Sequence, residues 1–184
     1  ATLMFKKFDP CSTAGEQLAK NSVQKAIRSA VVDAFPLLEE HLEDILPRRA
    51  KLTLRKGPDR SSIIIVEGKL LFIQTRDHIF PTLRLLHKYP FMMPHMRVDK
   101  GAIRFVLNGS SIMCPGLTSP GGFMEEGVPA NTAVAIMAEG KEHALAVGVT
   151  TMSTDEIRQV NSGIGIELIH HLKDPLWEAP SAPL

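Results

Sequence analysis

Two cations and a short run of glycine and serine lie close together between positions 99 and 117. Lys100 and Arg104 are four residues apart, so a helix would place both charges on one face. The segment Gly109–Ser111 follows them, and a loop of this composition leaves backbone amides that can donate to an anion. Cationic side chains beside such a loop suit the binding of a phosphate group, which makes this stretch the first candidate site.

The residues around these groups predict the helix that must position them. Asp99 can accept hydrogen bonds from first-turn amides, and Asn108–Gly109 supplies a left-handed residue at the end of the helix. Ile103, Val106 and Leu107 recur at helical spacing on another face. We therefore expect one face of this helix to enter a core and the other to present cations.

A short strand and a turn are predicted directly after the glycine-serine loop. Ile112–Cys114 has the composition of a buried strand, and Pro115 with Gly116 would end it in a turn. We expect the backbone amides of that turn to be available to a ligand. Ser119 precedes a proline and matches a proline-directed phosphorylation site, a dipeptide that is common by chance.

No pattern in the sequence predicts an enzyme. The seven histidines form neither H-x-H nor H-E-x-x-H, and the two cysteines, Cys11 and Cys114, are far apart in the chain. The chain lacks a G-x-S-x-G elbow and a G-K-[ST] phosphate loop. We predict no catalytic residues, no metal site, no cofactor and no structural disulfide.

Composition and charge are those of an ordinary globular protein. The 184 residues are 44% hydrophobic and 22% charged, and the formal net charge is only +1. Any surface for nucleic acid must therefore be local. The longest apolar run is too short and too interrupted to cross a bilayer, and no signal peptide is evident. We expect a soluble, cytoplasmic protein without a membrane partner.

The first half of the chain predicts a small α/β domain. Met4–Phe8 alternates like an edge strand with Phe5 inward. Apolar residues recur at helical spacing, and runs of β-branched residues alternate with turn residues. The expected helices are 16–35, 38–45 and 82–88, and the expected strands are 52–56, 62–66 and 69–75.

The second half predicts a β-barrel with helices over its openings. Strands are expected at 132–138, 144–152 and 164–172, with a helix capped by Ser153 before the last of them. Prolines at 90 and 94 bracket the crossing between the halves, so we place the boundary near Met93, which gives domains 1–93 and 94–184. The predicted fold class is α+β, a small N-terminal α/β domain followed by a β-barrel with flanking helices.

Five ordered blocks of the sequence resemble the malignant T-cell-amplified sequence family. They are MFKKF at 4–8, PTLRLLHKYPF at 81–91, VDKGAIRFVL at 98–107, IMCPGLTSPG at 112–121 and VAIMAEGK at 134–141. The likeness runs from Met4 to about Trp177 and is weakest at 9–20, 51–62 and 122–129. It implies an N-terminal pre-PUA domain and a C-terminal PUA domain, a small RNA-binding β-barrel.

The resemblance implies a non-enzymatic role in translation. Members of the family join the density-regulated protein and act on the small ribosomal subunit. There they aid tRNA recruitment or release in translation initiation, reinitiation and ribosome recycling. The PUA domain would face the acceptor end of the tRNA, and the N-terminal domain would dock on ribosomal RNA.

The resemblance also assigns residues to an RNA site. In PUA domains RNA commonly docks beside the first helix and the loop that enters the second strand. The matching positions here are Lys100, Arg104, Gly109, Ser110, Ser111, Pro115 and Gly116. By themselves, two cations on a helix are more often a solvated face. Arg84, His87 and Lys88 form a second basic face, whereas the Met4–Phe8 strand is expected to be structural.

Two other functions are compatible with the sequence. The chain could be an accessory protein or enzyme of RNA modification that uses the PUA unit as a handle. It could also be a protein scaffold without affinity for RNA. Turnover of an RNA nucleoside by the purified chain would favour the first, and the lack of a gel shift with structured RNAs would favour the second.

Overall fold

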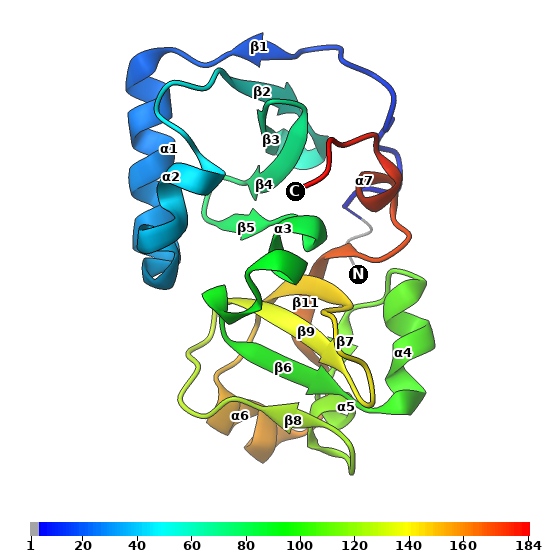
Figure 1. The fold of residues 1–184 in the computed structure, drawn as a ribbon. Helices are drawn as coiled ribbons and strands as arrows, with labels where there is room; N and C mark the ends of the chain where they lie inside the picture. The colour runs from blue at the N-terminus through cyan, green and yellow to red at the C-terminus, as the bar shows by residue number, and fades with distance from the viewer. Residues whose placement is uncertain (1–3) are drawn as a thin grey trace.

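The computed structural model describes residues 4–184 and contains two β-sheets, one above the other in Figure 1. The first sheet is antiparallel, and its five strands follow one another in chain order. They are β1 (Gln17–Leu18), β2 (Leu52–Lys56), β3 (Ser62–Val66), β4 (Lys69–Gln74) and β5 (Ile79–Pro81). Residues 19–51 separate β1 from β2, whereas short connections join β2 to β5; at Glu67–Gly68 the φ angles of 52° and 76° close a tight hairpin.

Helices cover one side of the first sheet and continue toward the second. They are α1 (Asn21–Ala34), η1 (Pro36–His41), α2 (Leu42–Ile45), η2 (Pro58–Arg60), α3 (Leu83–Lys88) and η3 (Pro90–Met92). The predicted helix over 16–35 begins later than expected, because Gln17–Leu18 pairs with β2. The three predicted strands and the helices at 38–45 and 82–88 are confirmed within a residue or two, with part of 38–45 in the tighter 3₁₀ form.

The second sheet curls into the predicted barrel. Its strands are β6 (His95–Val98), β7 (Ile112–Met113), β8 (Phe123–Met124), β9 (Ala133–Ala138), β10 (Ala146–Thr150) and β11 (Ile164–His171), paired in the order β7-β11-β10-β9-β6-β8. The helices are α4 (Lys100–Leu107), α5 (Cys114–Thr118) and α6 (Thr154–Val160). Ser153 caps α6 as predicted, because its hydroxyl accepts from the Glu156 amide at 3.2 Å. The α+β class is confirmed.

Two local predictions are wrong. Met4–Phe8 is not an edge strand, since residues 4–7 form a turn in which Phe5 is buried. The Phe5 ring packs edge-on against Phe8 and His170, with centroids 5.6 and 6.0 Å away, and these ring contacts replace strand pairing. Pro115–Gly116 is not a free turn either, because it lies in the first turn of α5, where proline is well accommodated.

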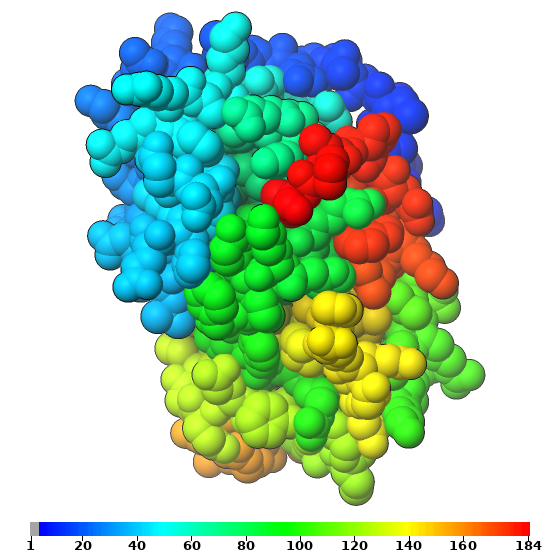
Figure 2. Space-filling view, viewed as in Figure 1, coloured from blue at the N-terminus to red at the C-terminus, as the bar shows by residue number. Residues whose placement is uncertain are grey.

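The C-terminal segment returns to the first sheet after the barrel is complete. Helix α7 (Pro175–Glu178) places Leu176 in an apolar core formed mostly by the first unit, which also includes Ala135, Ala144 and Val147 of the barrel. Beyond it, the Ala182 amide donates to the Gly68 carbonyl at 2.8 Å. Figure 2 shows this red segment lying against the first unit. The division into 1–93 and 94–184 stays a prediction.

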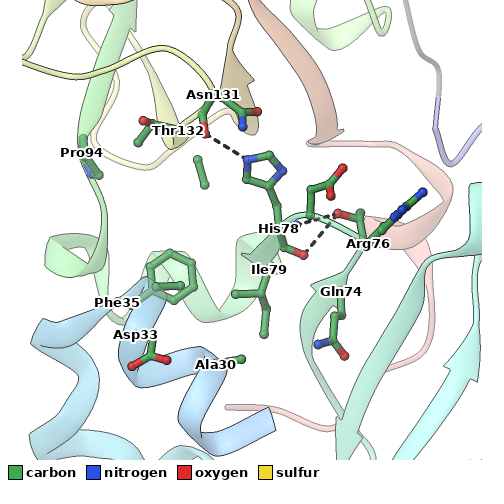
Figure 3. Close-up of a pocket in the computed structure, with 14 residues that line it drawn as sticks. Ala30, Asp33, Phe35, Gln74, Arg76, His78, Ile79, Pro94, Asn131 and Thr132 are labelled. Atoms are coloured by element: carbon green, nitrogen blue, oxygen red, sulfur yellow. Dashed lines mark hydrogen bonds between the residues drawn. The ribbon is translucent and has the colours of Figure 1, made fainter. Parts of the chain in front are cut away.

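Histidine side chains form hydrogen bonds between the first unit and the barrel. His78 Nε2 lies 3.0 Å from the Asn131 carbonyl oxygen, and His87 Nε2 lies 2.8 Å from that of Ala144. The Leu83 amide donates to His170 Nε2 at 3.2 Å. Figure 3 shows His78 pointing toward Asn131 beside a cavity of about 680 Å³ between the two units.

Candidate nucleic-acid interface

Helix α4 presents its faces as the sequence predicts. The Asp99 carboxylate caps it by accepting from the Ala102 amide at 2.9 Å. Gly109 follows its C-terminus with φ at 88°, a conformation that favours glycine. Val106 is buried in the barrel core, whereas Lys100 and Arg104 are exposed. The helix therefore holds both cations on the outside of the barrel.

The start of α4 is occupied by the chain's own carboxylates. Besides the Asp99 cap, Glu139 reaches over from the end of β9 and accepts from the Lys100 amide at 3.0 Å. Negative side chains are favourable at this end of a helix. These two amides are therefore already bonded, and an anion at α4 has to be held by side chains.

The seven predicted site residues do not share a single groove. Lys100 and Arg104 line a groove of about 680 Å³, which we call the cationic groove. Its lining comprises Lys100, Gly101, Ile103, Arg104, Leu107, Glu139, Gly140 and Lys141. Ser110, Ser111, Pro115 and Gly116 line a different groove of about 550 Å³ on the opposite side of α4, which we call the apolar groove.

The cationic groove contains a third cation that the sequence reasoning missed. Lys141 lies in the turn after β9, where its amide donates to the Ala138 carbonyl at 3.0 Å. β9 lies beside β6, which leads directly into α4, so this turn comes next to Lys100. The sequence does indicate a turn at Gly140–Lys141. That this turn lies beside α4 follows only from the parallel pairing of β6 with β9.

The apolar groove is formed largely by side chains that were not predicted. Phe105, Met113 and Ile164 are 51%, 50% and 41% exposed, although all three are large and hydrophobic. Asp99 is the one charged residue in the described lining of this groove. Helical spacing places Phe105 on a different face from Lys100, but Arg104 is its chain neighbour, and the Arg104 guanidinium lies 4.8 Å from the centre of the Phe105 ring.

The remaining loop residues support this groove. Gly109 is buried and shapes the turn rather than lining the groove. The Ser111 hydroxyl accepts from the Leu168 amide at 3.2 Å, which ties the loop to β11. Ser119 lies at the end of α5, half-buried, with its amide donating to the Pro115 carbonyl at 2.9 Å. Phosphorylation of Ser119 stays a prediction.

The second basic face carries less charge than its sequence suggests. Arg84 donates to the Trp177 carbonyl at 2.9 Å, and its guanidinium lies 4.3 Å from the centre of the Trp177 ring. Burial lowers the pKa of His87, and the neighbouring His143 lowers it further, while the hydrogen bond to Ala144 opposes this. His87 is therefore neutral near pH 7, and an RNA contact through Arg84, His87 and Lys88 stays a prediction.

Other chemistry at the described residues is limited. Across residues 4–184, His, Cys, Asp and Glu side chains nowhere gather in a group of three that could hold a metal ion. Over the same span, none of the helices has the length and apolar character needed to cross a membrane. Both cysteines are free; Cys114 is fully buried, and burial raises the pKa of its thiol. Cys114 thus packs as a small apolar residue, as predicted.

Two known domain families match the chain, and each match contains one of the two sheets. Residues 8–90 match the pre-PUA-like domain, and residues 94–172 match the PUA domain. A crystal structure of a hypothetical protein from the archaeon Pyrococcus horikoshii OT3 is similar with a TM-score of 0.73. It is 26% identical, and the match covers 90% of this chain and 99% of that one.

Comparison with curated proteins shows closer relatives over nearly the whole chain. Malignant T-cell-amplified sequence 1-B of Xenopus laevis is 52% identical over 176 residues, which are 95% of this chain and 97% of that protein. Translation machinery-associated protein 20 of Eremothecium gossypii is 44% identical over the same lengths. With its pre-PUA-like and PUA domains, the chain belongs to the malignant T-cell-amplified sequence family.

Proposed function

We propose that this chain is a non-enzymatic, cytoplasmic RNA-binding protein of translation. The observation that carries the proposal is the exposed cationic groove on α4, in which Lys100, Arg104 and Lys141 converge on a PUA barrel. One relative, translation machinery-associated protein 20 of Eremothecium gossypii, is named for the translation machinery. The finer proposal is a role in initiation, reinitiation and recycling on the small ribosomal subunit, where the PUA unit meets the tRNA acceptor end.

The two grooves suggest how an RNA end is held. Phosphate contacts position an RNA, and the three cations of the cationic groove supply them. Unpaired bases bind by stacking on aromatic side chains, and the half-exposed Phe105 ring offers such a surface on the other side of α4. Ser110 and Gly116 would then line the pocket for the unpaired end.

Charge reversal at α4 tests the RNA proposal. The double variant Lys100→Glu, Arg104→Glu should abolish co-sedimentation with small subunits and binding of tRNA, because two phosphate contacts become repulsive. The matched control, Lys20→Glu with Lys25→Glu, reverses two exposed lysines at the start of α1 and should leave binding unchanged. Equal binding by both variants, with thermal unfolding unaltered, would contradict the proposal.

Chemical footprinting tests where the protein acts on the small subunit. We expect protection of ribosomal RNA near the decoding and tRNA sites when the purified protein is added. Protection confined to regions remote from those sites would contradict the proposed role in initiation and recycling.

The absence of catalysis is tested directly. Incubation of the purified chain with tRNA, followed by mass analysis of the nucleosides, should show no altered nucleoside. Turnover of any nucleoside would instead support the alternative, an enzyme or accessory protein of RNA modification.

The apolar groove supports a second candidate, a site for the density-regulated protein. Phe105, Met113 and Ile164 expose apolar surface together, and the Asp99 charge beside them disfavours a phosphate. An apolar segment of a protein partner would bury these side chains, with the Arg104 guanidinium at the edge of the Phe105 ring, 4.8 Å from its centre. On this proposal the two proteins form a heterodimer, and the cationic groove stays open to RNA.

Matched phenylalanine variants separate the two uses of the apolar groove. Phe105→Ala should weaken binding of the purified density-regulated protein and leave tRNA binding intact if the partner docks there. Phe123→Ala is the control, because Phe123 is 50% exposed but lies on β8, outside the groove. Loss of tRNA binding by Phe105→Ala, with the partner still bound, would assign the groove to RNA.

A further inference from the structure

A further cavity lies at the C-terminal end of α4, where three distant parts of the chain meet. It has a volume of about 330 Å³, and we call it the terminal groove. Its lining comprises Met4, Phe5, Lys6, Leu107, Asn108, Leu168, Ile169, His171, Lys173, Asp174 and Pro175. Figure 1 shows the blue N-terminal segment descending beside α7 to the end of β11, near α4.

The terminal groove and the cationic groove lie on either side of one residue. Leu107, in the last turn of α4, lines both of them. Lys6 and Lys173 are exposed and line the terminal groove, so they add two cations beyond the last turn of α4. The N-terminal segment, expected to be structural, thus contributes a cation to this groove.

The acidic residue of the terminal groove does not offset these cations at its surface. Asp174 is 4% exposed, and its carboxylate accepts from His170 Nδ1 at 2.7 Å and from the Trp177 amide at 2.8 Å. Its charge is therefore directed into the protein. The rim of the groove is positive although the whole chain carries a formal charge of only +1.

We propose that an unpaired RNA strand bound at the cationic groove continues past Leu107 into the terminal groove, where Lys6 and Lys173 hold its phosphates. The inference rests on the proposed RNA-binding function and extends its site beyond the PUA unit to the N-terminal turn. Such a composite site favours single-stranded RNA, because a flexible strand can bend around the end of a helix and a rigid duplex cannot.

The interior of the terminal groove suits one unpaired base. Its volume lies within the range of about 300–1,000 Å³ typical of small-ligand pockets, and Phe5 and Leu168 give it an apolar floor. His171 Nδ1 lies 2.7 Å from the Leu172 carbonyl oxygen and must donate to it. Nε2 is therefore the ring nitrogen left to contact a base, and the exposed Asn108 amide can donate and accept beside it.

The test compares RNA binding by the double variant Lys6→Ala, Lys173→Asn with wild type. Asparagine is chosen because Lys173 has φ at 70°, which asparagine tolerates better than alanine. The probe is a fluorescein-labelled RNA hairpin with a four-nucleotide single-stranded 3′ tail, measured by anisotropy from 0.1 to 0.4 M KCl. The control Lys20→Ala, Lys25→Ala removes two lysines remote from the groove.

The expected result is a weaker and less salt-dependent complex. Each phosphate contact on a single strand contributes about 0.7 to the slope of log K against log salt, so the slope should fall by about 1.4. Binding at 0.15 M salt should weaken roughly tenfold, and the control should match wild type. A blunt hairpin should bind wild type and the Lys6, Lys173 variant equally.

Three outcomes would overturn the inference, and they are distinguishable from failure of the proposed function. An unchanged slope, while Lys100→Glu with Arg104→Glu still abolishes binding, would remove the terminal groove from the RNA site. An equal loss on the blunt hairpin would assign the lysines to duplex RNA. Loss of binding to polyglutamate, with RNA binding intact, would make the occupant an acidic protein segment. No RNA binding by wild type would instead reject the proposed function itself.

Discussion

At the scale of single residues, the hydrogen bonds of His170 between the two units determine which of its ring nitrogens carries the proton. His170 accepts a hydrogen bond from the Leu83 amide through Nε2, so its proton lies on Nδ1 and is donated to Asp174. Burial acts to raise the pKa of Asp174, but hydrogen bonds from His170, Trp177 and His171 outweigh it and lower the pKa below its usual value. At this interface His170 therefore donates through Nδ1 to the Asp174 carboxylate and accepts through Nε2 from the Leu83 amide.

His87 should make the stability of the protein depend on pH. Because the pKa of His87 is lower in the folded chain, the unfolded chain binds a proton first as pH falls below about 6.5. The free energy of unfolding should therefore decline between pH 7 and the lowered pKa of His87. Urea denaturation of wild type and His87→Gln across this range measures the difference, which should shrink as the pH falls.

Protonation of Asp174 does not interfere with the measurement on His87. Its lowered pKa affects stability only below its ordinary value of about 3.8, outside the His87 range. Equal pH dependence in wild type and His87→Gln would show that protonation of His87 does not oppose folding.

Lys100 and Arg104 show what residue types and spacing can predict. Both are exposed on one face of a helix, as their four-residue separation indicates. The partners Lys141, Lys6 and Lys173 were not predictable, because each reaches α4 through long-range packing rather than sequence proximity. The RNA-binding role of all these residues stays a prediction.

At the scale of elements, α4 depends on its cap. Asp99→Ala removes the acceptor for the Ala102 amide and should lower the free energy of unfolding by about 1 kcal/mol. Asp99→Asn should lose only a few tenths, since asparagine is an equally good N-cap. Chemical denaturation measures both; equal losses would indicate that the Asp99 charge, rather than its hydrogen bond, stabilises the helix.

Long periodic segments were predicted well, and short elements were not. The helix around α1 and the strands β2, β3 and β4 have clear apolar periodicity, and the structure confirms them apart from the late start of α1. β1, β5, β8, α5 and α7 have only two to five residues each, too few for a period to appear. Such elements form because a neighbouring strand or core stabilises them, which is information outside the segment.

At the scale of the whole molecule, the apolar groove and the cationic groove were predicted as a single site. Lys100 and Ser110 are only ten residues apart in the sequence, but they line grooves on opposite sides of α4. Separating the grooves requires knowing that β7 pairs with β11 on one side of the helix and that the β9 turn lies on the other. On the proposed function, this separation would leave the cationic groove open to RNA while a protein partner occupies the apolar groove.

The C-terminal segment should stabilise the first unit rather than the barrel it follows. Leu176 is 3% exposed within the first core, and the Leu70 amide donates to the Ser181 hydroxyl at 3.1 Å. Leu176→Ala should therefore lower the free energy of unfolding by about 2–5 kcal/mol. The control Leu37→Ala makes the same substitution at a 63% exposed position and should change it by less than about 0.5 kcal/mol.

Hydrogen exchange locates the effect of Leu176→Ala. Amides of β3 and β4 should lose protection before those of β10 and β11, because Leu176 lines a small cavity together with Leu70 of β4 and Leu83 of α3. The link from His170 to Leu83 should then transmit part of the loss to β11. Loss of protection confined to β10 and β11 would mean that the segment belongs energetically to the barrel, and the first unit would be stable without it.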